Sequence, residues 1–280
     1  MFTESSRIYF GIVALLLFAL GCASRGRPSG GEIDTTPPEI TEESPKNYSR
    51  NFKGDEIRIY FDEYVKIKDL QKQLIISPPM DTQPQISPQG SASKYITIKI
   101  KDTLAENTTY AFNFGNSIVD NNEENPFAYY RYVFSTGDTI DSLSVKGTVF
   151  DALSRNADPF VSVMLYELDT AYTDSIMYKQ KPKYITNTLD SLTTFSIDNI
   201  KEGMYKMVAL KEENSNFTYQ PKTDKIGFYE GEITVPTDSF YNITLFKEVT
   251  DFKVLKPSQV AEQRIQFPFE GQLETVEIEV

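Results

Sequence analysis

The sequence of 280 residues contains no histidine, no tryptophan and only one cysteine. Without histidine, the chain cannot build a catalytic triad or a metal site that depends on imidazole. With one cysteine, it has no internal disulfide framework and no zinc or iron–sulfur site made of several cysteines. The formal net charge of −12 argues against a nucleic-acid partner, because phosphate affinity needs a surplus of Lys and Arg.

Nucleotide-binding glycine loops and the G-x-S-x-G nucleophile motif are also missing, so the sequence predicts a protein that is not an enzyme. What is present is globular in composition, with 40% hydrophobic and 24% charged residues. That is enough apolar material to bury a core, which excludes a largely disordered chain. The length allows one large domain or two ordinary ones.

The N-terminus reads as an export signal. One Arg lies in the short polar start, and residues 8–20 form an apolar run of about a dozen residues, shorter than the roughly 20 that a membrane-spanning helix needs. Residues 1–21 are therefore predicted to be a signal peptide. A second interpretation is an N-terminal membrane anchor that happens to contain a Cys.

The end of this run, Ala19-Leu20-Gly21-Cys22, resembles the lipobox of bacterial lipoproteins. The resemblance implies cleavage before Cys22, lipid attachment to its thiol and amine, and a membrane bound through the lipid anchor. Residues 22–36 are rich in Gly, Ser and Pro and are predicted to be a flexible tether. In resembling lipoproteins an Asp after the Cys retains the protein at the inner membrane, so Ala23 implies the outer membrane. Arg25 and Arg27 favour a position facing the periplasm.

Residues 37–138 carry several strand signals. Apolar residues alternate with polar ones around Ile57 and Ile59 and around Ile96 and Ile98. Two aromatic series alternate in the same way, one that contains Phe112 and one that contains Tyr130 and Tyr132. Turn residues separate these runs, and the only helical pattern is short, near residues 68–72. Many short strands without a long amphipathic helix predict a β-sandwich. The alternation sends Tyr130 and Tyr132 to one face, toward the core.

Residues 141–249 repeat the pattern as a second unit, after a polar boundary at residues 135–139. Strands are predicted at 145–150, 161–166, 184–188, 194–197, 204–210, 232–235 and 241–246. Gly203 indicates a hairpin before the strand that starts at Met204. Residues 250–280 are predicted to be a linker and a β tail. We expect this tail either to dock on the second unit or to begin a third domain that is cut short.

Stretches such as DTTPPEI, IRIYFDEYVKIKDL, ISPQGSASKYITIKI and YVFSTGD make residues 34–138 similar to a bacterial Ig-like domain of the SbsA type, as found in Bacteroidota lipoproteins. KGTVFDAL, VSVMLYELD and TTFSIDNIKEGMYKMVALKEEN resemble carboxypeptidase-regulatory or prealbumin-like sandwiches. The resemblance implies two tandem β-sandwiches. It also implies that such domains are spacers or interaction modules without chemistry of their own.

One segment could bind calcium. Glu212, Asn214 and Asn216 place oxygen ligands at alternate positions and Asp224 follows, which resembles a degraded calcium loop in which Phe217 takes the place of the glycine. The other interpretation is an Asn-rich turn. We predict no other cofactor.

Asp followed by Ser or Thr recurs in turn-rich stretches, and this pattern resembles the acceptor of periplasmic O-glycosylation in the same bacterial group. It is also ordinary turn chemistry. The candidate acceptors are Thr35, Thr103, Thr139, Ser142, Thr170, Ser175 and Ser191.

The sequence thus predicts an all-β, lipid-anchored envelope protein of two sandwiches that serves as a structural or protein-interaction module. The alternative is an envelope module that binds a glycan or a peptide through its loops or an exposed strand edge.

Overall fold

The computed structural model describes residues 31–154, 158–189, 192–249 and 252–271. Strands dominate this part of the chain, and its helical pieces are the short α2 (Leu70–Gln73) and a 3-10 turn at Ile176–Tyr178. The predicted all-β class of tandem sandwiches is confirmed. No helix in these ranges is long and apolar enough to cross a membrane. The predicted signal peptide and Cys22 lie outside the described residues.

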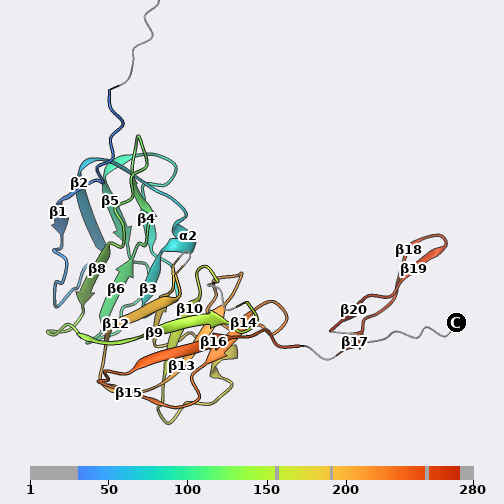
Figure 1. Ribbon diagram of the computed structural model, residues 1–280. Coiled ribbons are helices and arrows are strands. Elements are labelled where there is room, and N and C mark those ends of the chain that lie inside the picture. The colour runs from blue at the N-terminus through green and yellow to red at the C-terminus, as the bar shows by residue number, and fades with distance from the viewer. Residues whose placement is uncertain (1–30, 155–157, 190–191, 250–251, 272–280) are drawn as a thin grey trace, which may run out of the picture. The chain divides into compact units, whose positions relative to one another are not determined.

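The first sandwich consists of two antiparallel sheets (Figure 1). One sheet has the order β1-β2-β5-β4, with β7 also paired to β2, and the other has the order β3-β6-β8. Their strands are β1 (Ile40–Ser44), β2 (Glu56–Ile67), β3 (Ile75–Ser77), β4 (Gln85–Ser87), β5 (Ser93–Lys99), β6 (Thr109–Asn113), β7 (Ile118–Asp120) and β8 (Arg131–Ser135).

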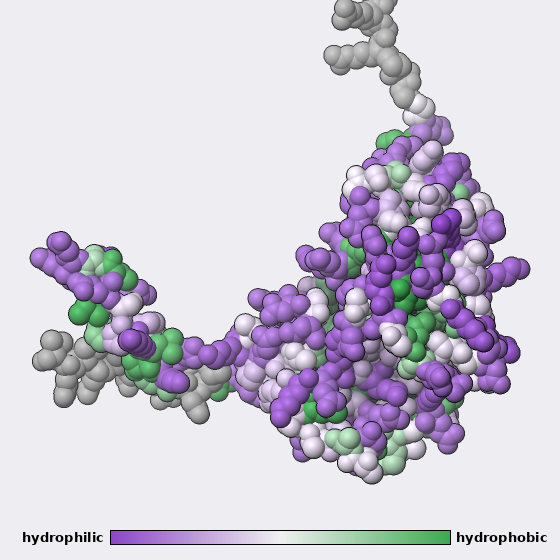
Figure 2. Space-filling view, turned by 180° about the vertical axis from the view of Figure 1, so that it is seen from behind, coloured by the Kyte–Doolittle hydropathy of each residue, from purple (hydrophilic) through white to green (hydrophobic). Residues whose placement is uncertain are grey.

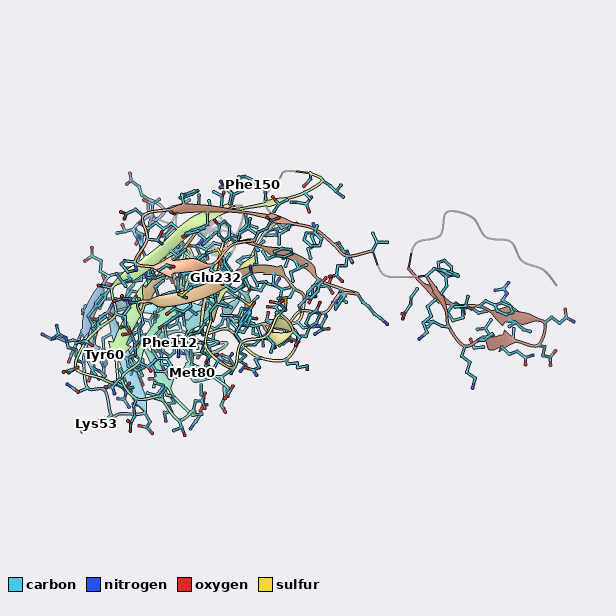
Figure 3. All side chains as sticks on the ribbon, turned by 90° about the horizontal axis from the view of Figure 1, so that it is seen from below. Lys53, Tyr60, Met80, Phe112, Phe150 and Glu232 are labelled. Carbon is cyan, nitrogen blue, oxygen red and sulfur yellow. The ribbon has the colours of Figure 1, made fainter. Side chains whose placement is uncertain are left out.

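The core of the first sandwich follows the alternation in the sequence. Ile57 and Ile59 of β2 are fully buried and belong to the same apolar cluster as Phe112 and Phe134 of the other sheet. Tyr132 is also fully buried, which confirms the inward direction predicted for it. In Figure 3, the labelled Phe112 lies within the first sandwich. The period of two therefore determined which face of each strand is apolar.

The second sandwich also has two sheets. One has the order β12-β9-β16, in which β9 and β16 run parallel, and the other has the order β11-β10-β13-β14, with β15 paired to β13. Its strands are β9 (Leu143–Asp151), β10 (Ser162–Glu167), β11 (Tyr184–Asn187), β12 (Thr194–Ile200), β13 (Gly203–Lys211), β14 (Lys225–Phe228), β15 (Ile233–Val235) and β16 (Phe240–Leu245).

The hairpin predicted at Gly203 is wrong. β12 pairs with β9, whereas β13 pairs with β10, so Lys201 and Glu202 carry the chain from one sheet to the other. A bulge between Asp198 and Ile200 precedes this crossing, with Asn199 at a φ of 60°. A bulge bends a strand, and such bends let a chain change sheets at the corner of a sandwich.

The strand β14 was missed by sequence analysis. It is four residues long and contains Gly227, so it has almost no alternation to detect. The glycine is required by close packing, since a Cβ at this position would lie 2.5 Å from the carbonyl oxygen of Thr244 in β16. The outer face of the β10 sheet is covered by a second apolar cluster, which includes Met164, Tyr166 and Val208.

The described part of the tail forms short antiparallel pairs, β17 (Lys253–Val254) with β20 (Phe269–Glu270) and β18 (Ser258–Ala261) with β19 (Arg264–Gln266). We call residues 252–271 the tail hairpin. Its apolar side chains are exposed, as the hydrophobic patches on it in Figure 2 show, while most of the remaining surface in that view is hydrophilic. The rest of the predicted β tail, residues 272–280, lies outside the described ranges.

Candidate functional site: the contact between the two sandwiches

The predicted calcium ligands lie on the loop between β13 and β14, where they bind the loop's own backbone. The Glu212 carboxylate accepts hydrogen bonds from the N–H groups of Asn216, at 2.8 Å, and Phe217, at 3.0 Å. Asp224 accepts one from the N–H of Gln220 at 2.8 Å. These bonds hold the loop as a compact turn.

Two features bear on calcium binding at this loop. Burial raises the pKa of Glu212, and the negative charge of Asp224 raises it further. Among the described residues, no three His, Cys, Asp or Glu side chains gather as a metal site would require. Asn214 donates to the Gln220 amide oxygen at 3.5 Å. The Asn216 Oδ1 accepts a hydrogen bond from the Thr218 N–H at 3.0 Å. Oxygens of Glu212, Asn216 and Asp224 are thus engaged in internal contacts, and the calcium site stays a prediction.

The described candidate glycosylation sites lie at the surface. These residues are exposed: Thr35, Thr103, Thr139, Ser142, Thr170 and Ser175. Ser191 lies outside the described residues. Exposure is necessary for modification but does not demonstrate it, so glycosylation also stays a prediction.

The two sandwiches meet where β3 of the first lies beside β11 of the second, and we call this contact the seam. Ile75 of β3 is 8% exposed and belongs to the outer apolar cluster of the second sandwich, together with Ile185 of β11. Two residues further along β3, the Ser77 Oγ accepts a hydrogen bond from the Ile185 N–H at 3.1 Å. β11 is the outer strand of its sheet, so Ser77 satisfies a backbone donor that would otherwise lack a strand partner.

Arg131, the first residue of β8, makes the main polar contact of the seam. Its Nη1 donates to Asp198 Oδ2 at 2.7 Å and its Nη2 to Asn199 Oδ1 at 2.8 Å. The same Asn199 amide donates through Nδ2 to the Asp141 carbonyl oxygen at 2.7 Å. Charged hydrogen bonds with two acceptors fix both distance and orientation. The bulge in β12 that carries Asn199 therefore positions the residue that links β8 to the segment between the sandwiches.

Two lysines extend the seam on either side. Lys181 Nζ donates to the Met80 carbonyl oxygen at 2.7 Å and lies 3.3 Å from Asp81 Oδ1. Lys201 Nζ donates to the carbonyl oxygen of Asn107 at 2.5 Å. The seam therefore combines an apolar contact with several specific polar ones. This arrangement can hold the two sandwiches together as one folding unit.

Sequence analysis did not find these seam residues. Ser77, Arg131 and Asn199 belong to no motif, and Arg131 and Asp198 are 67 positions apart. The weak signal for Asn199 was its residue type, since Asn tolerates a positive φ better than most residues.

A partly buried ion network lies in the second sandwich, outside the seam. Lys225 at the start of β14 donates to Asp151 Oδ2 at 2.7 Å and to Asp158 Oδ2 at 3.0 Å. The Lys225 hydrogen bond, with help from the backbone N–H groups of Ser154 and Leu153, holds the pKa of Asp151 far below its usual range. The Asp151 bond also raises the pKa of Lys225. The network ties the end of β9 to β14.

Residues 34–136 match the family model described as Bacterial Ig-like domain. This part of the chain is a bacterial Ig-like domain. The resemblance drawn from the sequence is thereby confirmed at the level of the Ig-like domain. The finer assignment to the SbsA type, and the likeness of the second sandwich to carboxypeptidase-regulatory domains, stay predictions.

Two solved structures are similar at low level. One is the crystal structure of BcpA, the major pilin subunit of Bacillus cereus, at 11% identity and a TM-score of 0.24, covering 75% of this chain and 71% of that one. The other is its D312A form, at 11% identity and a TM-score of 0.21, covering 68% and 62%. No curated protein matches the chain.

Proposed function

We propose that this protein is a lipid-anchored structural or protein-interaction module of a bacterial cell envelope, without enzymatic activity. The observation that carries the proposal is the seam, in which Ile75, Ser77 and Arg131 of the Ig-like domain contact the second sandwich directly. A contact of this kind suits a spacer that holds a partner at a fixed distance and orientation from the membrane anchor. Independent domains on a flexible linker lack such a set of specific contacts.

The rest of the proposal draws on composition and family. A bacterial Ig-like domain over residues 34–136 supports a place in the envelope. The single Cys of the chain stands at position 22, after an apolar run, where lipid attachment would need it. Acyl chains contribute about 0.8 kcal/mol for each buried methylene, so several chains would hold the protein on a bilayer. We propose the outer membrane, with the protein facing the periplasm, and envelope proteins as its partners.

The anchor is tested by metabolic labelling with a palmitate analogue in the bacterial host. The full chain should incorporate the label and sediment with membranes, and Cys22→Ala should lose both properties. Ser24→Ala, two positions away, is the matched control and should label like the full chain. If Cys22→Ala still labels, the anchor lies elsewhere and this part of the proposal is wrong.

A further inference from the structure

The second sandwich has a cleft on the outer face of its β12-β9-β16 sheet. The cleft has a volume of about 360 Å³, within the usual range for small-ligand sites. The strand register places Ser196, Lys146 and Phe240 in one row across the three strands, because Ser196 and Phe240 are both Cα partners of Lys146. Thr186 and Asn187 of β11 line the same cleft.

Asn187, which lines the cleft, has a buried side-chain oxygen without a hydrogen-bond partner. Its side chain is 7% exposed, and its Oδ1 atom is buried without a hydrogen-bond partner. Buried polar atoms in folded proteins almost always have partners, so an orphan beside a cleft calls for an explanation. If the Asn187 side chain turns toward the cleft, a ligand O–H or N–H group can supply the missing bond.

The other lining groups narrow the class of ligand. The Thr194 hydroxyl, the Asn187 amide and the Ser196 Oγ, which donates to Asp198 Oδ1 at 2.7 Å and keeps its acceptor lone pairs, suit a ligand rich in hydroxyl groups. The Phe240 ring, 59% exposed, offers an apolar face for stacking. Within the described ranges Lys146 makes no ion pair, so its ammonium group can donate to a ligand.

The backbone argues against a peptide as the occupant. A peptide that adds to a sheet needs unpaired N–H and C=O groups at a strand edge. Among the strands that line the cleft, β9 pairs with β12 on one side and with β16 on the other, and the outer strand β11 already donates its Ile185 N–H to Ser77 of β3. Side chains are therefore what this face offers to a ligand.

We propose that this cleft binds an oligosaccharide, with the sugar ring stacked on Phe240 and sugar hydroxyls bonded to Asn187, Ser196 and Lys146. This inference does not depend on the lipid anchor, although Asn113 of the first sandwich and the seam residue Asp198 also line the cleft. Its failure would leave the structural role of the two sandwiches intact.

Isothermal titration calorimetry of the purified protein tests the proposal, with cellotetraose, chitotetraose and tetragalacturonate as probes. At least one should bind with a Kd of about 1 mM or tighter. Phe240→Ala should weaken that binding about tenfold or more, because it removes the stacking surface. Phe246→Ala is the matched control, since Phe246 is an exposed aromatic that does not line this cleft, and it should leave the Kd unchanged.

A second variant separates binding from stability. Asn187→Leu removes the orphan acceptor, so it should abolish binding of the responsive probe while the melting temperature stays unchanged or rises. The proposal is overturned if none of the three probes binds, or if Phe240→Ala and Asn187→Leu bind as well as the unaltered protein. Binding of an extended hexapeptide of alternating Val and Thr at this cleft, in place of the sugars, would also overturn it.

Discussion

At the residue scale, one carboxylate carries a measurable part of the stability of the second sandwich. Asp151 lies at the end of β9 with its side chain 9% exposed, and it accepts hydrogen bonds from Lys225 and from two backbone N–H groups. Asp151→Asn keeps the shape but removes the charge, so we expect a loss of about 1–3 kcal/mol in the free energy of unfolding. Chemical denaturation at neutral pH measures this loss.

The same contact gives a pH dependence with a defined sign. The pKa of Asp151 is lowered in the folded protein, so its contribution is present above the ordinary Asp pKa of about 4 and disappears as the pH falls further. The difference in unfolding free energy between the original protein and Asp151→Asn should therefore shrink in acid. A difference that is constant from neutral to strongly acidic pH would contradict the charged pairing.

Buried tyrosines provide a second residue-scale prediction. Burial raises the pKa of Tyr132, in the first sandwich, and of Tyr184, in the second, to about 12. Because the folded state holds these protons more tightly than the unfolded chain, the tyrosines' contribution to stability should be constant below the ordinary Tyr pKa of about 10 and fall as the pH rises through 12. An ultraviolet absorbance titration should show a late group of tyrosines that ionises together with unfolding.

The sequence predicted residues of the core, but it did not predict residues that pair with partners far away in the chain. Ile57, Phe112 and Tyr132 were assigned to the core because alternation along a single strand states which face is apolar. Arg131 and Asp151 were not identified, since their partners Asp198 and Lys225 lie 67 and 74 positions away. A local sequence pattern does not predict which strand ends, distant in the sequence, lie close together in the fold.

At the scale of elements, close packing of β9 against β16 depends on one glycine. A Cβ at Gly147 would lie 2.0 Å from the Tyr241 carbonyl oxygen and 2.6 Å from the Phe195 ring. Gly147→Ala must therefore shift backbone as well as side chains, and we expect a loss of about 1–3 kcal/mol or more in unfolding free energy.

Gly54→Ala is the matched control for this substitution. Its added Cβ would meet only ordinary contacts, the nearest being the Phe52 ring at 3.5 Å. Thermal and chemical unfolding of the two variants should thus differ clearly. Equal stabilities would contradict the parallel pairing of β9 with β16.

Strand existence was easier to predict than strand pairing. The strands near 145–150 and 204–210 were expected from alternation and are present as β9 and β13. The link before Met204 was expected to be a hairpin, but the bulge at Asn199 turns the chain into the other sheet. A short loop with a glycine predicts that the chain turns. It does not predict which sheet the next strand joins.

At the scale of the whole molecule, the seam joins the two sandwiches. The sequence predicted two tandem sandwiches and a polar boundary near residues 135–139, but a polar boundary is equally typical of a loose linker. The contact depends on Ile75 filling the apolar cluster of the second sandwich and on Arg131 reaching Asp198 and Asn199. These contacts join elements that are distant in the sequence, so only the structure identifies them.

Differential scanning calorimetry of the purified protein tests whether the seam couples the two sandwiches. Because the sandwiches share the seam, they should unfold in a single transition whose calorimetric and van't Hoff enthalpies agree. The double variant Ile75→Ala with Arg131→Ala should split that transition into two. Arg58→Ala, which removes an exposed pair with Glu56 and a cation–π contact with Tyr95 within the first sandwich, should leave it single. Two separate transitions in the unaltered protein would contradict the account.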